Sequence, residues 1–166
     1  AIQNLLWGLG QPVFGALADR FGTWRVLSIS AVFYAIGMIL MATAETPTML
    51  HLGGGVLVGL AVAGSSFSIV LAAFARNTPP EKRSIVFGIG TAAGSAGMFL
   101  FAPISQGLIS ALGWSDALVW LGILMLAIPV LAIPLAGNSK SGTVSQVQFE
   151  QSMGAALREA FAHKSY

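Results

Sequence analysis

The chain has 166 residues, of which 55% are hydrophobic and only 8% are charged. Soluble domains carry about 25% charged residues, so this composition excludes an ordinary soluble enzyme or nucleic-acid-binding domain and indicates a protein of the lipid bilayer. The net charge of +2 fits basic residues that anchor helix ends at a membrane surface.

The charged residues are confined to positions 19–25, 45, 76–83, 116 and 140–164. Between these positions lie five apolar spans, at about 1–18, 26–44, 48–75, 84–112 and 115–136, and each can cross about 30 Å of hydrocarbon as a helix. We therefore expect an all-α polytopic membrane protein. If the spans alternate in direction, every Lys and Arg lies on one side, which the positive-inside rule places in the cytoplasm.

The first and second spans are joined by a short charged turn, which contains Asp19, Arg20, Gly22 and Arg25. So many polar residues in so short a connection predict that the chain reverses direction at the level of the lipid headgroups. The chain begins without Met, inside an apolar run. We therefore expect a fragment whose first helix is truncated at its amino end.

Small residues recur at four-residue spacing in the third and fourth spans. They allow membrane helices to approach closely, so we expect these two spans to cross closely, either for packing alone or to permit sliding. Pro103 lacks a backbone N–H and predicts a bend in the fourth span. The glycines concerned are Gly55, Gly59, Gly90, Gly94 and Gly97.

No Asp, Glu, Lys or Arg lies within the five spans, so any pathway through them has to be lined by neutral polar groups. A serine in such a position can instead bond to the backbone of its own helix. With two separated His and no Cys, the sequence predicts no catalytic residues, no metal site and no cofactor. The candidate lining residues are Gln11, Ser65, Ser66, Ser68 and Gln106.

Residues 137–166 form the hydrophilic stretch of the chain, which begins with the small and polar residues of a flexible linker. Phe149, Met153, Leu157 and Phe161 then recur at intervals of four. This spacing predicts an amphipathic helix at about 147–162 on the cytoplasmic surface. A disordered linker is the alternative.

Two of the turns between spans resemble one another. An odd number of spans separates them, so equivalent elements would point to opposite sides of the membrane, as in an inverted repeat. Such repeats favour secondary transporters over receptors or membrane enzymes. The equivalent residues are Pro12, Gly15, Gly22 and Trp24 in the first turn, and Pro103, Gly107, Gly113 and Trp114 in the fourth.

The first turn resembles the signature loop of the major facilitator superfamily, G-x-L-a-D-r-x-G-r-[kr]. Thr23 and Trp24 depart from its basic part. In this family the loop joins the second and third of twelve helices, so the resemblance implies that residues 1–136 are helices two to six, built on inverted three-helix repeats, and that 137–166 is the central cytoplasmic loop. The matching residues are Gly15, Leu17, Asp19, Arg20, Gly22 and Arg25.

The resemblance implies a role for Asp19 in gating. Its carboxylate would engage the positive end of a helix in the missing carboxy-terminal half, together with a basic neighbour, and so lock the outward-facing state. The candidate neighbours are Arg76, Lys82 and Arg83.

The resemblance also implies secondary active transport by alternating access, in a bacterial inner membrane. The glycine-rich third span and the pair Gly113–Trp114 resemble the monocarboxylate and oxalate/formate branch, which implies a small organic anion as the solute. The alternatives are a drug/proton antiporter of the same superfamily and a membrane sensor that binds solute without moving it. The expected partners are the bilayer, the solute and the missing half of the transporter, with no nucleic acid.

Overall fold

The computed structural model describes residues 1–138, which form helices and no strand. The predicted amphipathic helix at 147–162 lies outside the described residues. The described elements in chain order are α1 (Ile2–Phe21), α2 (Thr23–Ala42), α3 (Pro47–Leu50), η1 (His51–Leu57), α4 (Val58–Gly64), α5 (Phe67–Asn77), η2 (Pro80–Lys82), α6 (Arg83–Leu112), α7 (Trp114–Met125), α8 (Ala127–Leu131) and η3 (Ile133–Asn138).

Four segments of this described part are long and apolar enough to cross a membrane: Thr23–Ala42, Pro47–Asn77, Pro80–Leu112 and Trp114–Leu135. They coincide with the second to fifth predicted spans. Helix α1 has a comparable length of 20 residues but contains the polar residues Gln3, Asn4 and Gln11, and it is not among the four. The first membrane span therefore stays a prediction.

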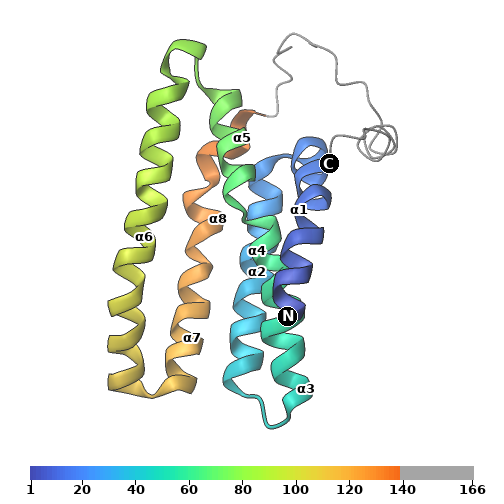
Figure 1. Ribbon diagram of the computed structural model, residues 1–166, viewed down its shortest axis with the longest axis vertical. Helices are drawn as coiled ribbons and strands as arrows, with labels where there is room; N and C mark the ends of the chain where they lie inside the picture. Colours follow the sequence, from blue (N-terminus) through green and yellow to red (C-terminus); the bar gives the residue numbers. More distant parts are fainter. Residues whose placement is uncertain (139–166) are drawn as a thin grey trace, which may run out of the picture.

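The elements run up and down, so that α1 meets α2 and α5 leads to α6 at the same end of the bundle (Figure 1). Arg20, Arg25, Arg76, Lys82 and Arg83 all belong to these two connections. We call this the basic end. The α2–α3 and α6–α7 connections lie at the opposite end, with Glu45 and Asp116.

Two helix connections are reduced to a single glycine. Gly22 separates α1 from α2 with φ 93°, and Gly113 separates α6 from α7 with φ 85°. These positive φ angles favour glycine because it has no Cβ. In each turn the glycine N–H closes the preceding helix, bonding to the carbonyl oxygen of Ala18 at 3.0 Å and of Ile109 at 2.9 Å respectively. The two turns compared in the sequence thus have the same positive-φ glycine and the same closing hydrogen bond, at opposite ends of the bundle.

Helix α2 occupies the centre of the packed part and contacts α1, η1, α4 and α7. Glycines bring the backbones of α2 and η1 together: a Cβ atom on Gly37 would lie 2.9 Å from the carbonyl oxygen of Gly53, and one on Gly53 would lie 2.8 Å from that of Gly37. Real Cβ contacts are longer than this, so the two helices can meet only through glycine.

The two predicted glycine faces do not pack against each other. A Cβ atom on Gly59 would lie 3.2 Å from Gln3 of α1, whereas one on Gly90 would lie 3.2 Å from Phe74 of α5. Gly55 also faces α1, Gly94 comes no nearer than 4.0 Å to Phe67, and Gly97 has no described atom within 4 Å of such a Cβ. The spacing predicted small-residue faces, but it could not predict what each face meets.

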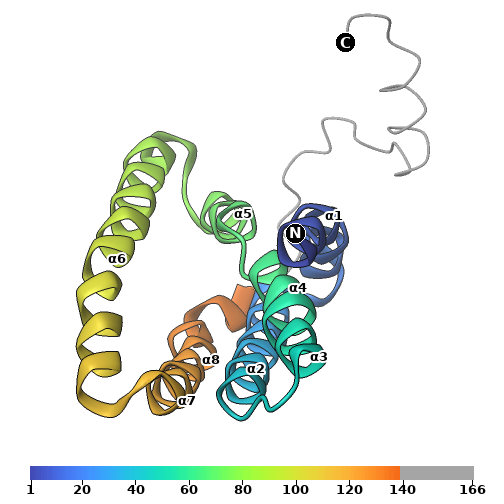
Figure 2. The ribbon, with the colours of Figure 1, turned by 60° about the horizontal axis from the view of Figure 1, so that its bottom comes forward.

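Helix α6 stands apart from the cluster of α1, α2 and α4 and is joined to it through α5 at one end and α7 at the other (Figure 2). It continues through Pro103 as one helix of 30 residues. None of the membrane-length window of Pro80–Leu112 is buried within the described structure, compared with 39% of that in α2.

The third span is not one regular helix. It contains a π-helical stretch at His51–Leu57 and is interrupted between α4 and α5, where Ser65 and Ser66 leave the helical conformation. The last span is also interrupted, at Leu126 between α7 and α8. Hydropathy alone gave no sign of these breaks, because it stays high across them.

Candidate functional site

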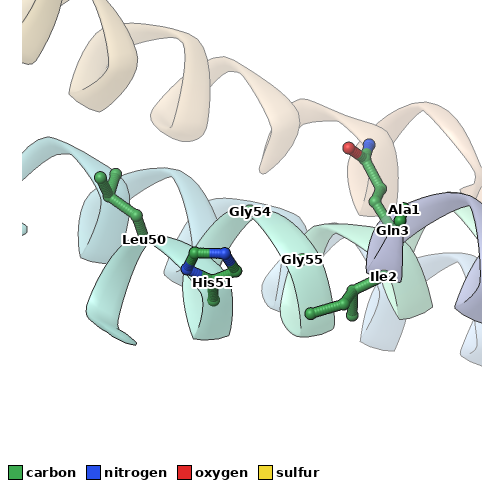
Figure 3. A pocket seen from close by; sticks show the side chains of 7 residues that line it. All are labelled: Ala1, Ile2, Gln3, Leu50, His51, Gly54 and Gly55. Carbon is green, nitrogen blue, oxygen red and sulfur yellow. The ribbon is translucent and has the colours of Figure 1, made fainter. Parts of the chain in front are cut away.

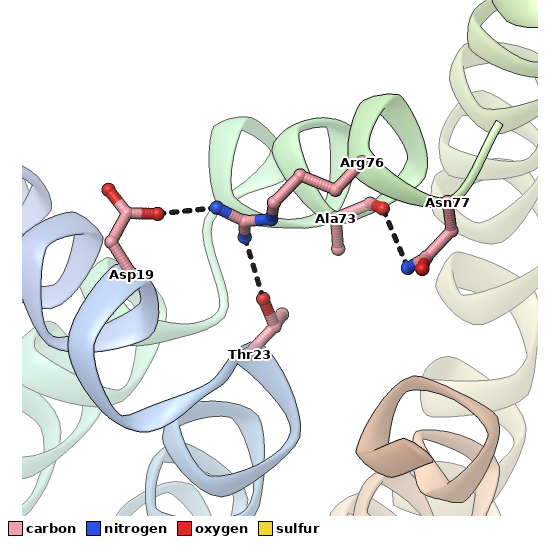
Figure 4. Close-up of polar contacts among 5 residues, drawn as sticks. All are labelled: Asp19, Thr23, Ala73, Arg76 and Asn77. Carbon is pink, nitrogen blue, oxygen red and sulfur yellow. Dashed lines mark hydrogen bonds and ion pairs between the residues drawn. The ribbon is translucent and has the colours of Figure 1, made fainter. Parts of the chain in front are cut away.

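At the basic end, one arginine connects three helix ends (Figure 4). Arg76, in the last turn of α5, donates through Nη1 to the Oδ1 atom of Asp19 at 2.5 Å and through Nη2 to the Oγ1 atom of Thr23 at 2.9 Å. Asp19 lies in the last turn of α1, and Thr23 is the first residue of α2. We call these three residues the Asp19–Thr23–Arg76 cluster.

The local sequence explains the geometry of this cluster. Helix α1 ends at Phe21, and the positive φ of Gly22 reverses the chain, so that Asp19 and Thr23 come to lie on either side of the same tight turn. Below the turn, Ala18, Val26 and Ile69 form a small apolar cluster against which Leu17 packs. This contact joins α5 to α1 and α2 and so brings Arg76 within reach of the turn.

The cluster is accessible to solvent. The Asp19 side chain is 68% exposed and that of Arg76 is 42% exposed, whereas Thr23 is buried. Exposed ion pairs contribute little to folding stability because water screens them and two long side chains have to be ordered. The apolar contact of Ile69 with Ala18 and Val26 sets the position of the helix ends, and the exposed contact between Asp19 and Arg76 can break at little cost.

The other predicted basic partners do not reach Asp19. Arg83 donates through Nε to the backbone oxygen of Thr78 at 3.2 Å, and Lys82 is exposed. Arg76 is thus the residue of the three that the structure places against Asp19. Thr23, a departure from the signature, was not predicted as part of the site. The sequence feature that could have indicated Thr23 is its hydroxyl group, which stands where the signature has a basic residue.

The remaining signature residues lie around the turn. Arg20 stacks over the ring of Phe21, with 5.4 Å between the guanidinium carbon and the ring centroid, and Arg25 is exposed. No described atom lies within 4 Å of a Cβ atom built on Gly15, so within residues 1–138 this glycine makes no close contact with another helix.

The predicted pathway residues are scattered. Ser65 donates to the backbone oxygen of Ala61 at 2.8 Å, which is the alternative role considered for it, and the hydroxyls of Ser66 and Ser68 pair at 3.0 Å. Gln106 makes a 3.4 Å hydrogen bond to Ser110 on α6, and Gln11 is half-buried on α1. The structure does not gather these residues into one site.

Sequence reasoning missed a buried polar residue, Ser30 on α2. Its side chain is fully buried and its Oγ atom has no hydrogen-bond partner within the described structure. It faces the end of α4, where a Cβ atom on Gly64 would lie 2.0 Å from this hydroxyl. A serine amid an apolar run carries no sequence signal that distinguishes a buried, unpartnered hydroxyl from one bonded to its own helix.

A pocket of about 400 Å³ lies between the start of α1 and the beginning of η1 (Figure 3). The His51 ring contacts the backbone oxygen of Pro47 through Nδ1 at 2.6 Å. The pocket is separate from the Asp19–Thr23–Arg76 cluster, and no group of acidic, His or Cys side chains suited to a metal occurs in the described part of the chain. The lining residues are Ala1, Ile2, Gln3, Leu50, His51, Gly54 and Gly55.

Comparison with known proteins identifies one family of membrane transporters. The sequence profile of the Major Facilitator Superfamily matches residues 1–165. Monocarboxylate transporter 13 of Bos taurus is 32% identical over 70% of this chain and 27% of its own length. Tetracycline resistance protein, class C, of Escherichia coli is 35% identical over 68% of this chain and 27% of its own length.

A third relative, the uncharacterized MFS-type transporter YhjX of Escherichia coli strain K12, is 33% identical over 81% of this chain and 33% of its own length. The chain thus spans about a quarter to a third of the length of these relatives. No solved structure matches it significantly. The profile match over almost the whole sequence, together with the apolar helices, establishes that this chain belongs to the major facilitator superfamily of multi-pass membrane transporters.

Proposed function

We propose that this chain is part of a secondary active transporter that moves a small organic anion, such as a monocarboxylate, by alternating access. The observation that carries the proposal is the Asp19–Thr23–Arg76 cluster, in which one exposed arginine ties together the ends of α1, α2 and α5. Alternating access requires contacts that close one end of a bundle and then release it. A solvent-exposed, charge-assisted contact between helix ends meets this requirement.

The direction of gating follows from the charge distribution. The basic residues of the described part all lie at the basic end, and the positive-inside rule assigns such an end to the cytoplasm. The intact cluster would then favour the state closed to the cytoplasm. An impermeant maleimide applied from outside should label a cysteine at Thr46 but not one at Glu81. The opposite labelling pattern would reverse the assignment.

The choice of substrate class rests on similarity. A relative named as a monocarboxylate transporter supports an organic anion, whereas a relative named for tetracycline resistance favours drug efflux as the second candidate. The four apolar segments of the described structure include no charged residue within their central parts. A charged group that recognises an anion would therefore come from outside these four segments.

The test is transport by the full-length protein in proteoliposomes. We expect uptake of labelled short-chain monocarboxylates down an imposed gradient, and no protection of tetracycline-sensitive cells. Drug efflux without carboxylate flux would replace the proposal by its second candidate. Binding of solute without net flux would instead identify a sensor. Asp19→Asn should lower the rate of flux while leaving membrane insertion intact, and an unchanged rate would remove the gating role.

A further inference from the structure

Trp24 connects the signature turn to the last span. It is the second residue after Gly22, and its indole Nε1–H donates to the backbone oxygen of Pro129 in α8 at 3.0 Å, across 105 residues of sequence. This side chain stands where the family signature has a basic residue. The bond ties the first turn of α2 to α8, which also packs against α2.

The same arrangement recurs at the opposite end. Ser115 is the second residue after the other turn glycine, Gly113, and its hydroxyl donates to the backbone oxygen of Ala42, the last residue of α2, at 2.7 Å. The antiparallel pair of α2 and α7–α8 is therefore clamped at both ends. In each clamp, a side chain two residues after the positive-φ glycine bonds to a carbonyl group near the end of the partner.

The geometry of the helix ends makes both carbonyl groups available. The last turn of an α-helix leaves its carbonyl groups without intrahelical donors. Ala42 ends α2, and Pro129 lies in the short helix α8, which follows the irregular residue Leu126 and ends at Leu131. Between the clamps the pair is closely packed, since a Cβ atom on Gly122 would lie 3.3 Å from the backbone oxygen of Ala35.

The two clamps differ in what stands beside them. Trp24 directly follows Thr23, whose hydroxyl accepts a hydrogen bond from Arg76, whereas Ser115 has no such neighbour cluster among the described residues. We propose that Trp24 is a positioning residue for the Asp19–Thr23–Arg76 cluster. By fixing the first turn of α2 to α8, it holds the Thr23 hydroxyl where Arg76 can bond to Thr23 and Asp19 together.

Any effect of Trp24 on transport rests on the gating role in the proposed function. Its role in positioning the Asp19–Thr23–Arg76 cluster does not. Tryptophan near a membrane surface commonly serves as an interfacial anchor that contacts lipid headgroups. Here the indole N–H is directed to a backbone carbonyl group of the same protein. An anchor would act on the depth of the helix in the membrane, whereas a positioning residue acts on the cluster.

The experiment uses the full-length protein, otherwise free of cysteine, with a cysteine in place of Ala18, which is buried next to Asp19. Its rate of reaction with N-ethylmaleimide reports opening of the basic end. Trp24→Phe removes the donor and keeps an aromatic ring, and we expect it to raise the rate about five-fold, the effect of losing one net hydrogen bond. Ser115→Ala removes the matching bond at the opposite end and should change the rate less than about two-fold.

A double-mutant cycle with Arg76 tests whether Trp24→Phe acts through the Asp19–Thr23–Arg76 cluster or loosens the whole helix bundle. In an Arg76→Gln background the cluster is already broken, so Trp24→Phe should add no further increase in labelling. Equal effects of Trp24→Phe and Ser115→Ala, no effect of either, or the same increase with and without Arg76 would each overturn the proposal. If Trp24→Phe does not fold, benzothienylalanine at position 24 replaces the N–H group by sulfur at nearly constant shape and is held to the same criteria.

The result can be told apart from a failure of the proposed function, because labelling requires no substrate. Protein that moves no monocarboxylate but shows the expected labelling pattern would retain Trp24 as a positioning residue and lose only the substrate class. Protein that transports monocarboxylate but shows equal effects of the two clamps would retain the function and lose the positioning role.

Discussion

Helices α2 and α6 have similarly apolar sequences, yet they are packed in different ways. Eight residues of α2 are buried, whereas the described structure buries none of α6. Both helices are bordered by a positive-φ glycine and both contain small residues. The difference shows that a glycine-rich apolar helix is not by itself evidence of a tight interface. A glycine marks a tight helix contact only where the backbone of another helix lies against it, as Gly53 lies against Gly37.

The largest expected effect tests this contrast directly. Gly37→Ala places a methyl group 2.9 Å from the carbonyl oxygen of Gly53, and neither backbone can move away without separating α2 from η1. We expect a loss of about 2 to 3 kcal/mol in the free energy of unfolding, as in overpacked cores. Unfolding of the purified full-length protein by a denaturing detergent measures it.

The matched control is Gly97→Ala on α6, where the new methyl group meets no described atom within 4 Å. It should leave stability unchanged or raise it slightly, by up to about 1 kcal/mol, because alanine restricts the unfolded chain. A loss as large as that of Gly37→Ala would mean that α6 is as closely packed as α2 in the complete protein. The contrast between the two helices would then belong only to residues 1–138.

A second comparison is between Arg76 and Lys82, two cations of the same connection at the basic end. Arg76 bonds to both Asp19 and Thr23, whereas Lys82 is exposed. We expect Arg76→Gln to lower the transport rate about tenfold, as Asp19→Asn should, since it removes the same charge-assisted pair, with little loss of stability. Lys82→Gln should leave the rate within about two-fold, and equal effects would point to net charge instead of the specific contact.

The sequence predicted where the long apolar segments begin and end better than it predicted the contacts between them. The second to fifth apolar segments predicted from hydropathy agree within a few residues with the helical segments of the structure, because charged residues, which are costly in hydrocarbon, mark their ends. The tight turn at Gly22 was also predictable from its composition. The breaks at Ser65 and Leu126 were not, because a helix interrupted inside a bundle remains just as apolar as a continuous one.

The site was predictable only in outline for the same reason. The signature indicated Asp19, but Arg76, Lys82 and Arg83 are separated by so few residues that spacing could not select one of them. The selection comes from the contact of Ile69 with Ala18 and Val26, which fixes where α5 ends. Trp24 and Ser115 were similarly hidden, because each bonds to a backbone carbonyl group whose position depends on the whole fold.

The smallest expected effect concerns Ser30, the polar side chain at the centre of the packed part. Its hydroxyl is fully buried without a hydrogen-bond partner in residues 1–138, next to Gly64. Burying an unsatisfied hydroxyl costs free energy, so Ser30→Ala should raise the free energy of unfolding by about 1 kcal/mol and relieve the contact with Gly64. Gly64→Ala, which adds a methyl group against the same hydroxyl, should lower it.

The pair of variants identifies what the hydroxyl does in the complete protein. If Ser30→Ala instead lowers stability by about 1 kcal/mol or more, the hydroxyl has a partner there, such as an ordered water molecule or a group from outside this chain. The gain and the loss lead to different descriptions of α2. A gain in the free energy of unfolding would mean that α2 is held in the interior by packing alone. A loss would mean that the Ser30 hydroxyl makes a polar contact in the interior of the transporter.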